Sequence, residues 1–237
     1  MDMIAKKMIG VVKRKENLAG NNWLLVIGLP EVADFIPGQF VSLKVSDEGL
    51  RRSYSVASLP GKADIDLIID VTPMGIGSKY VLGLKVGDSV ELLGFLGNFV
   101  VEDDVLLSSK EVIFIGTGTG IVPFRPMIEG LLVKKGYKGQ VRLVWGMRYV
   151  SDLFWFEEIK KLQSEFANFR FELVLSRPDE SWQGARGHVG DVLEGLADDW
   201  QKVTAYLCGN QMMIDETREK LLGKGVNDES IIFEKFA

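Results

Sequence analysis

The hydrophobic pattern of this 237-residue chain changes near residue 110, and that change constrains the fold more than any other feature. Through the first hundred residues, apolar side chains recur at every second position, as in Val41, Leu43 and Val45. Turn signals such as Pro37-Gly38 and Gly87-Asp88 separate these runs at short intervals. Alternation with period two places one set of side chains on one buried face of a sheet. The first hundred residues therefore predict a small all-β barrel or sandwich.

From Lys110 onward, short apolar strands alternate with stretches that have helical spacing. The helical stretches cover 153–166 and the residues from Met213 to the glycines at 223 and 225. The expected strands are residues 112–115, 141–145, 171–175, 204–208 and 231–233. Strands that alternate with helices indicate βαβ units and a buried parallel sheet. The acidic segment 102–109 is the expected seam between the two halves.

The charge balance and the rare residue types exclude several classes of protein. Lys and Arg number 28 against 33 Asp and Glu, and the net charge of −5 argues against nucleic-acid binding through phosphate contacts. No uncharged stretch reaches the length of about 18 residues that a membrane-spanning helix needs, so we expect no span. A single cysteine, Cys208, excludes a disulfide or a cysteine-ligated iron–sulfur cluster within these residues. With His188 as the one histidine, we expect no metal site, and we expect a reducing cytoplasmic setting.

A glycine-rich segment, Gly116-Thr117-Gly118-Thr119-Gly120, directly follows the strand expected at 112–115. Glycines let a backbone approach a phosphate closely, and a helix that begins after them presents free N–H groups and its positive dipole end. Pro123 suits the first turn of such a helix, where a missing N–H costs nothing. The spacing differs from G-x-G-x-x-G. The segment predicts a loop that binds phosphate or a dinucleotide, and a tight turn without a ligand is the alternative.

A second candidate site lies in the β half, at Arg52-Ser53-Tyr54-Ser55. Arginine can clamp a diphosphate, tyrosine can cover an aromatic ring, and serine can bond a ring nitrogen. On a regular strand Arg52 and Tyr54 share one face and the two serines share the other, so one ligand would need a twist or bulge to meet all four. The stretch Gly75-Ile76-Gly77-Ser78 offers further N–H groups. A solvated polar strand and a plain hairpin connection are the alternatives.

In chain order, these segments resemble the ferredoxin–NADP(+) reductase family of flavoproteins over nearly the whole chain. The family's flavin motif R-x-Y-S is present as Arg52 to Ser55, and its nicotinamide loop G-x-G-x-G-x-x-P as Gly116 to Pro123. Further family segments are matched by Pro37-Gly38-Gln39-Phe40, Ile68-Ile69-Asp70, Gly75 to Ser78, Gly146-Met147-Arg148, Ser176-Arg177-Pro178, Cys208-Gly209-Asn210 with Met213, and Phe233-Glu234-Lys235-Phe236. Each segment alone is weak, and the complete set in family order is specific.

The resemblance implies two domains: an FAD-binding antiparallel β-barrel at 1–105, and an NADPH- or NADH-binding α/β domain with a five-stranded parallel sheet at 106–237. It implies that Arg52 holds the FAD diphosphate, that Tyr54 lies against one face of the flavin ring, and that Phe236 stacks on the flavin face that the nicotinamide must reach. The implied catalytic group is Ser55, Cys208 and Glu234. The implied cofactor-binding positions are Arg52, Ser53, Tyr54, Ser55, Ile68, Ile69, Asp70, Gly75, Ile76, Gly77, Ser78, Gly116, Thr117, Gly118, Thr119, Gly120, Pro123, Met147, Arg148, Ser176, Arg177, Arg186, Cys208, Gly209, Asn210, Met213 and Phe236.

The activity that the resemblance implies is hydride transfer from nicotinamide to flavin, followed by electron delivery to a separate acceptor. Ferredoxin, flavodoxin or an oxygenase component would suit as acceptor. Arginines after successive strands (Arg148, Arg177 and Arg186) favour NADPH slightly over NADH. Two alternatives stay open: a flavin reductase that uses free flavin as substrate, and a non-catalytic subunit that senses redox state. The sequence identifies neither the acceptor nor the oligomeric state.

Overall fold

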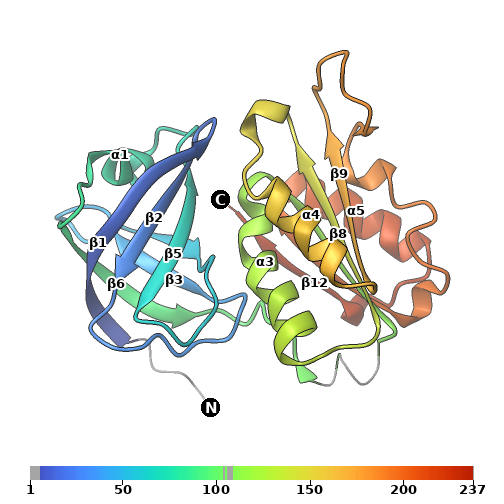
Figure 1. Cartoon of the computed structure of the whole chain (residues 1–237), viewed down its shortest axis with the longest axis horizontal. Helices are drawn as coiled ribbons and strands as arrows, with labels where there is room; N and C mark the ends of the chain where they lie inside the picture. The colour runs from blue at the N-terminus through green and yellow to red at the C-terminus, as the bar shows by residue number, and fades with distance from the viewer. Residues whose placement is uncertain (1–5, 104, 106–108, 237) are drawn as a thin grey trace. The chain divides into compact units, whose positions relative to one another are not determined.

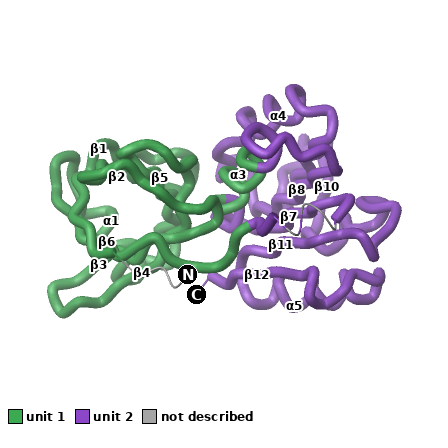
Figure 2. Tube along the Cα trace, turned by 90° about the horizontal axis from the view of Figure 1, so that it is seen from below, with its two compact units in different colours: residues 1–100, 122–130 green, residues 101–121, 131–237 purple. Residues whose placement is uncertain are grey.

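The computed structural model describes residues 6–103, 105 and 109–236, and they form two compact units (Figures 1 and 2). Unit 1 is drawn from residues 1–100 and 122–130, and unit 2 from residues 101–121 and 131–237. The segment 122–130 thus belongs to unit 1, although it follows the glycine-rich segment in the chain. Residue 106, where the second domain is expected to begin, lies outside the described residues, so that boundary stays a prediction.

Unit 1 contains an antiparallel sheet of six strands in the order β4-β3-β6-β1-β2-β5. The strands are β1 (Lys6–Ala19), β2 (Asn22–Gly28), β3 (Phe40–Lys44), β4 (Arg51–Ser55), β5 (Asp64–Asp70) and β6 (Ser89–Leu96). The two ends of this order meet at a bridge between Val56 and Leu67, where the Ala57 N–H also donates to the Asp66 carbonyl at 2.8 Å. The sheet therefore closes on itself, and the expected antiparallel barrel is confirmed.

The barrel core follows from the alternation in the sequence. Val41 and Leu43 on β3 and Ile65 and Leu67 on β5 are fully buried in one apolar cluster. Asp66, between the last two, lies on the other face of its strand and is half-buried. Period-two patterning is thus sufficient to place the inward side chains.

A short helix, α1 (Ile76–Gly83), occupies the glycine-rich stretch that the sequence does not predict to be helical. Gly75 precedes it in an extended conformation, and the Lys79 N–H donates to the Gly75 carbonyl at 3.0 Å. Glycine is a poor helix former, so the glycine-rich composition of this stretch does not indicate a helix. The N–H groups of Ile76, Gly77 and Ser78 lie in its first turn, where the helix offers no acceptors of its own.

Unit 2 contains a parallel sheet of six strands in the order β10-β9-β8-β7-β11-β12. The strands are β7 (Glu111–Thr117), β8 (Gln140–Met147), β9 (Phe169–Leu175), β10 (Ala185–Arg186), β11 (Val203–Gly209) and β12 (Ile231–Lys235). All five expected strands are present, and β10 adds a sixth at one edge. Because β10 has only two residues, it is too short to show any periodic pattern.

Three further helices are α3 (Ile121–Glu129), α4 (Phe156–Glu165) and α5 (Gln211–Gly223). Helix α4 begins three residues later than expected, because Trp155 has a left-handed φ of +61° and a 3-10 turn covers residues 150–152. The side chain of Asn210 caps the amino-terminal end of helix α5, because its oxygen accepts the Met213 N–H at 2.9 Å. No helix in the described residues is long and apolar enough to cross a membrane.

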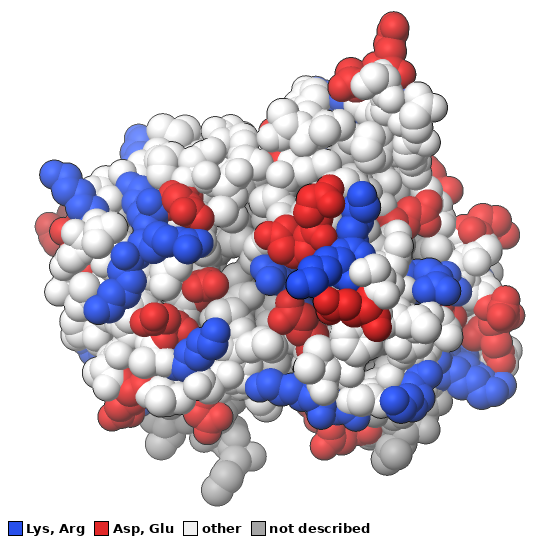
Figure 3. All heavy atoms as spheres, in the orientation of Figure 1, with Lys and Arg blue, Asp and Glu red and all other residues white. Residues whose placement is uncertain are grey.

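The charged side chains form a mixed surface. Lys and Arg lie beside Asp and Glu in several places on the face drawn in Figure 3. Exposed ion pairs include Lys220 with Asp191 at 3.2 Å and Lys202 with Asp199 at 2.8 Å. Such exposed pairs contribute about 0–1 kcal/mol each, so they indicate solvation and not a site.

Candidate functional site

Strand β4 carries the Arg-Ser-Tyr-Ser motif in regular antiparallel register with β3, in which Leu43 is opposite Arg52 and Val41 is opposite Tyr54. Side chains on a regular strand alternate between faces. Arg52 and Tyr54 therefore share one face, and Ser53 and Ser55 share the other. This register has no bulge that would bring all four onto one face.

Gly77 of α1 lies against Arg52 and Tyr54. A Cβ at Gly77 would overlap the Tyr54 hydroxyl and would lie 3.0 Å from Cγ of Arg52. The tyrosine is half-buried, and burial raises its pKa although the Arg52 guanidinium opposes the shift. The structure thus joins an arginine, an aromatic ring and the first-turn N–H groups of a helix. An anion with an attached aromatic ring fits such a group.

The segment Ile68-Ile69-Asp70 at the end of β5 contributes less than expected through its side chains. Ile69 packs in the barrel core, and Ile68 is 4% exposed. The Asp70 carboxylate accepts the backbone N–H of Thr72 at 2.8 Å. Among these three residues, only Asp70 has an exposed side chain.

In unit 2, β7 leads into the glycine loop, which forms a 3-10 turn (Gly118–Gly120) before α3 begins. Gly118 has a left-handed φ of +57°, which glycine adopts without strain. A Cβ at Gly120 would overlap the Cys208 carbonyl oxygen, so only glycine permits this approach to β11. Pro123 occupies the first turn of α3, as expected.

Gly209, at the end of β11, lies next to the same loop. A Cβ on Gly209 would lie 2.5 Å from Oγ1 of Thr117 and 2.5 Å from Cε of Met213. Met213 is buried, and its sulfur accepts a hydrogen bond from the Thr217 hydroxyl at 3.6 Å. The structure therefore brings Thr117, Gly209 and Met213 together, and all three are among the predicted cofactor-binding positions.

Three neighbouring strands place Gly116, Cys208 and Glu234 in one row, because Cys208 is in register with Gly116 on β7 and with Glu234 on β12. Burial raises the pKa of Glu234 to about 7. Burial, followed by the Glu234 charge, raises the pKa of the Cys208 thiol well above its ordinary value. The thiol is therefore neutral near pH 7, while the carboxyl is divided between its two forms.

The remaining predicted positions of unit 2 lie at the carboxyl ends of its strands. Ser176 donates its N–H to the Met147 carbonyl at 2.9 Å, and Arg177 donates its N–H to the Arg148 carbonyl at 3.0 Å. Both arginines are exposed. The Arg186 guanidinium instead donates to the carbonyls of residues 179 and 182 at 3.1 and 2.8 Å.

Ser55 and Phe236 lie in different units. Ser55 is 7% exposed on β4 of unit 1. Phe236 follows β12, is half-buried, and donates its N–H to the Gly209 carbonyl at 3.0 Å. The meeting of Ser55 with Cys208 and Glu234, and the stacking of Phe236 on a flavin, stay predictions. Ala237 lies outside the described residues.

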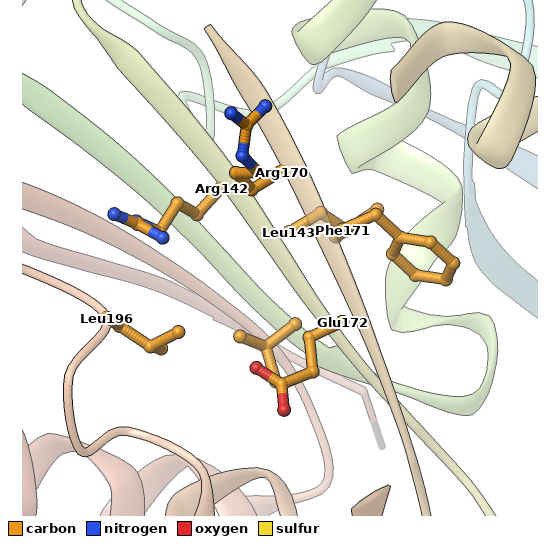
Figure 4. A pocket seen from close by; sticks show the side chains of 7 residues that line it. Arg142, Leu143, Arg170, Phe171, Glu172 and Leu196 are labelled. Atoms are coloured by element: carbon orange, nitrogen blue, oxygen red, sulfur yellow. The ribbon is translucent and has the colours of Figure 1, made fainter. Parts of the chain in front are cut away.

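A cavity of about 240 Å³ opens elsewhere in unit 2 (Figure 4). Arg142 and Arg170 line it from the amino-terminal ends of β8 and β9, with Glu172 and Leu196 nearby. The glycine loop follows the opposite, carboxyl-terminal end of the sheet. The cavity is therefore separate from the candidate site.

Sequence reasoning missed two side chains that support the candidate site. Trp145 donates its indole N–H to the Gly118 carbonyl at 2.9 Å, and Thr217 holds the Met213 sulfur. Both are buried. Trp145 stands directly before the Gly146-Met147-Arg148 match, but no periodic pattern indicates where a buried indole N–H points.

A closed antiparallel barrel with an arginine–tyrosine–helix cluster, next in the chain to a parallel sheet with a glycine loop, is the arrangement expected of a flavin- and nicotinamide-dependent oxidoreductase. Family models agree: the oxidoreductase FAD-binding domain matches residues 10–101, and the oxidoreductase NAD-binding domain matches residues 114–219. The chain belongs to the oxidoreductases that combine these FAD-binding and NAD-binding domains, its fold is that of ferredoxin–NADP(+) reductase-type flavoproteins, and its cofactors are FAD and NAD(P)H.

Individual relatives have different roles. The toluate 1,2-dioxygenase electron transfer component of Pseudomonas putida is 28% identical over 204 residues, which are 86% of this chain and 59% of that protein. The Na(+)-translocating NADH-quinone reductase of Marinomonas sp. (strain MWYL1) has a subunit that is 32% identical over 206 residues, 80% of this chain and 50% of that protein. The chain thus spans about half to three-fifths of the length of these relatives.

Solved structures show the same fold. The Amycolatopsis cytochrome P450 reductase GcoB superposes with a TM-score of 0.89 at 27% identity, covering 98% of this chain and 70% of that one. A ferredoxin NADP+ reductase from Neisseria gonorrhoeae superposes with a TM-score of 0.84 at 21% identity, covering 98% and 99%. The two-domain architecture expected from the sequence is therefore confirmed.

Proposed function

We propose that the chain is an NAD(P)H-dependent reductase that passes a hydride from the nicotinamide to FAD and electrons on to a separate acceptor. When bound, the two cofactors supply the redox chemistry, and the flavin can release electrons singly. The observation that carries the proposal is that one chain holds two clusters, one suited to each cofactor. They are Arg52, Tyr54 and Gly77 in unit 1, and the glycine loop with Cys208 in unit 2.

In unit 1, the proposed task is to hold FAD. Arg52 would pair with the diphosphate through charge-assisted hydrogen bonds, and the first-turn N–H groups of Gly77 and Ser78 would share the same charge. Tyr54 would present its ring to the flavin. Gly77 supports this arrangement because its missing side chain leaves the room between Arg52 and Tyr54.

In unit 2, the proposed task is to orient the nicotinamide cofactor. The loop at 116–120 would receive the diphosphate on its backbone N–H groups. Cys208 and Glu234 would line the reacting ring together with Ser55 of unit 1, Cys208 as a neutral thiol. A hydride carries its own electron pair, so no general base is required, and alignment is the protein's contribution.

We propose NADPH as the preferred donor. Arg148 and Arg177, exposed and joined through their backbones, offer two guanidinium groups for a 2′-phosphate. Arg148→Ala should then lower kcat/KM for NADPH about tenfold or more, the scale of one charge-assisted hydrogen bond, and leave the value for NADH nearly unchanged. An equal loss with both cofactors would show that Arg148 does not read the phosphate.

For the acceptor we propose ferredoxin, flavodoxin or an oxygenase component. Two relatives support a protein acceptor: one is an electron transfer component of a dioxygenase and another is a cytochrome P450 reductase. These roles are those of the two relatives, so the acceptor of this chain has to be identified by experiment.

Anaerobic stopped-flow reduction of the purified protein tests the whole proposal. We expect yellow protein with about one FAD per chain, rapid bleaching by NADPH, and reoxidation by ferricyanide and by at least one protein acceptor. FAD that is lost on gel filtration and turns over as free substrate would instead establish a flavin reductase. Nucleotide binding without bleaching would establish a redox-sensing subunit.

A further inference from the structure

Trp145 is the largest fully buried side chain of the described residues, yet it carries a polar N–H group. That group donates to the carbonyl of Gly118 at 2.9 Å. Gly118 lies at the beginning of the 3-10 turn that joins β7 to α3. A core side chain is therefore bonded directly to the backbone of the proposed diphosphate loop.

The bond determines which way one peptide group faces. Gly118 C=O and Thr119 N–H belong to the same planar, trans peptide unit, so the two groups point in opposite directions. Because the Gly118 carbonyl points at the buried indole, the Thr119 N–H points away from it. Gly118 adopts the required φ of +57°, and a Cβ there would meet nothing within 4 Å, so backbone conformation accounts for this glycine.

The indole is itself held firmly. Trp145 lies in the middle of the sheet, in register with Gly116 on β7 and Leu173 on β9. The Phe154 ring packs against the indole in a T-shaped arrangement, with a centroid distance of 5.3 Å and an interplanar angle of 71°. At the far end of the turn, Gly120 packs closely against the Cys208 carbonyl, whose oxygen a Cβ at Gly120 would overlap. Both ends of the loop are thus attached to the sheet.

We propose that Trp145 is a positioning residue for the nicotinamide cofactor: through the Gly118 carbonyl it directs the Thr119 N–H toward the diphosphate. This inference rests on the proposed function and adds to it a side chain that the cofactor does not touch. The alternative is a tryptophan that only fills the core and happens to satisfy its N–H.

Trp145→Phe tests the inference, because it keeps an aromatic ring and removes the donor. We expect the KM for NADPH and the Kd for NADP+ to rise about threefold to tenfold, the net value of one hydrogen bond. The kcat with ferricyanide and the FAD content should stay near wild type, since a contact made equally in ground and transition states changes KM alone. Trp200→Phe is the matched control and should change neither, because Trp200 precedes the amino-terminal end of β11, whereas the loop follows the carboxyl-terminal end of β7.

A double-mutant cycle with Gly118→Ala separates positioning from packing. Alanine at φ +57° is strained and disturbs the same peptide without filling occupied space. If both residues act through that peptide, the Kd of the double variant will be no worse than that of the weaker-binding single variant. Independent losses that multiply in the double variant would overturn the proposal.

Other outcomes are also decisive. An unchanged Kd in folded Trp145→Phe would refute the inference, and so would a parallel fall of kcat, FAD content and Tm. If Trp145→Phe does not fold, exchange of the Thr119 amide in the wild type decides: NADP+ should slow it, and no slowing would count against the proposal. A wild type that binds neither NADP+ nor NAD+ would defeat the proposed function itself.

Discussion

Glu234 and Cys208 form a pair of acids that burial keeps protonated at unusually high pH. The Glu234 carboxyl has a pKa of about 7, and the Cys208 thiol beside it has a pKa well above the ordinary value. Ionising either group in this surrounding is costly, and the carboxylate makes ionisation of the thiol costlier still. The charge of this corner of unit 2 therefore changes by one near neutral pH.

The pH dependence of stability checks this pair. Because the pKa of Glu234 is raised from 4.5 to about 7 on folding, its contribution is fully present below pH 4.5 and is lost as pH rises to about 7. Wild type should thus lose stability relative to Glu234→Gln between pH 4.5 and 7, with no further relative change above. Thermal melts of both proteins at pH 5, 6, 7 and 8 measure this difference in stability. Parallel curves would show an ordinary carboxyl pKa.

At the scale of elements, α1 shows how a glycine inside a helix can serve a neighbouring strand. Gly77 is the second residue and Gly83 the last residue of α1, and helices normally disfavour glycine. A Cβ at Gly77 would strike Tyr54 and Arg52 of β4, whereas a Cβ at Gly83 would meet nothing within 4 Å. The two positions therefore form a natural matched pair.

We expect Gly77→Ala to weaken FAD binding by roughly tenfold to a hundredfold, because displaced Arg52 loses one charge-assisted hydrogen bond. Gly83→Ala should leave FAD binding unchanged and add roughly 0.5–1 kcal/mol to the free energy of unfolding of the apoprotein. Fluorescence titration with FAD and urea denaturation give the two quantities. Equal FAD affinity in both variants would mean that the cluster around Gly77 does not hold the cofactor.

At the scale of the whole molecule, each cofactor should stabilise the chain through its own unit. A ligand at a hundred times its Kd adds about 2.7 kcal/mol to the free energy of unfolding. FAD and NADP+ should each raise Tm in the wild type. Arg52→Ala should reduce the shift with FAD and keep the shift with NADP+, and Trp145→Phe should do the reverse. If each substitution reduced both shifts equally, the assignment of one cofactor to each unit would be wrong.

Periodicity predicts most of this architecture, since alternation and helical spacing are local properties of a sequence. The main strands of both sheets follow from it, and the exceptions are informative. Helix α1 is obscured by its glycines, and β10 has only two residues. The Cys208–Glu234 register joins residues 26 positions apart, so only the family resemblance brings them together before the fold is known.

The sequence does not predict which side chains support the site, because that depends on the direction in which each side chain points. In the sequence, Trp145 is one residue of an apolar strand and Thr217 one residue of a helix. Their hydrogen bonds depend on side-chain rotamers and, for Trp145, on a neighbour 27 positions away in the chain. Arg186 illustrates the opposite case, because an arginine at a plausible position is engaged by the carbonyls of its own loop. Residue type alone does not distinguish these outcomes.

The segment 122–130 has a consequence for synthesis on the ribosome. The first hundred residues emerge without Phe124, whose ring lies 6.0 Å from that of Phe99, and without Met127, whose sulfur would lie 3.1 Å from a Cβ on Gly38. Unit 1 is complete only when residue 130 has been made, after β7 of the other sheet. A nascent chain released at residue 105 should therefore be more readily cut by proteases than one released at residue 130.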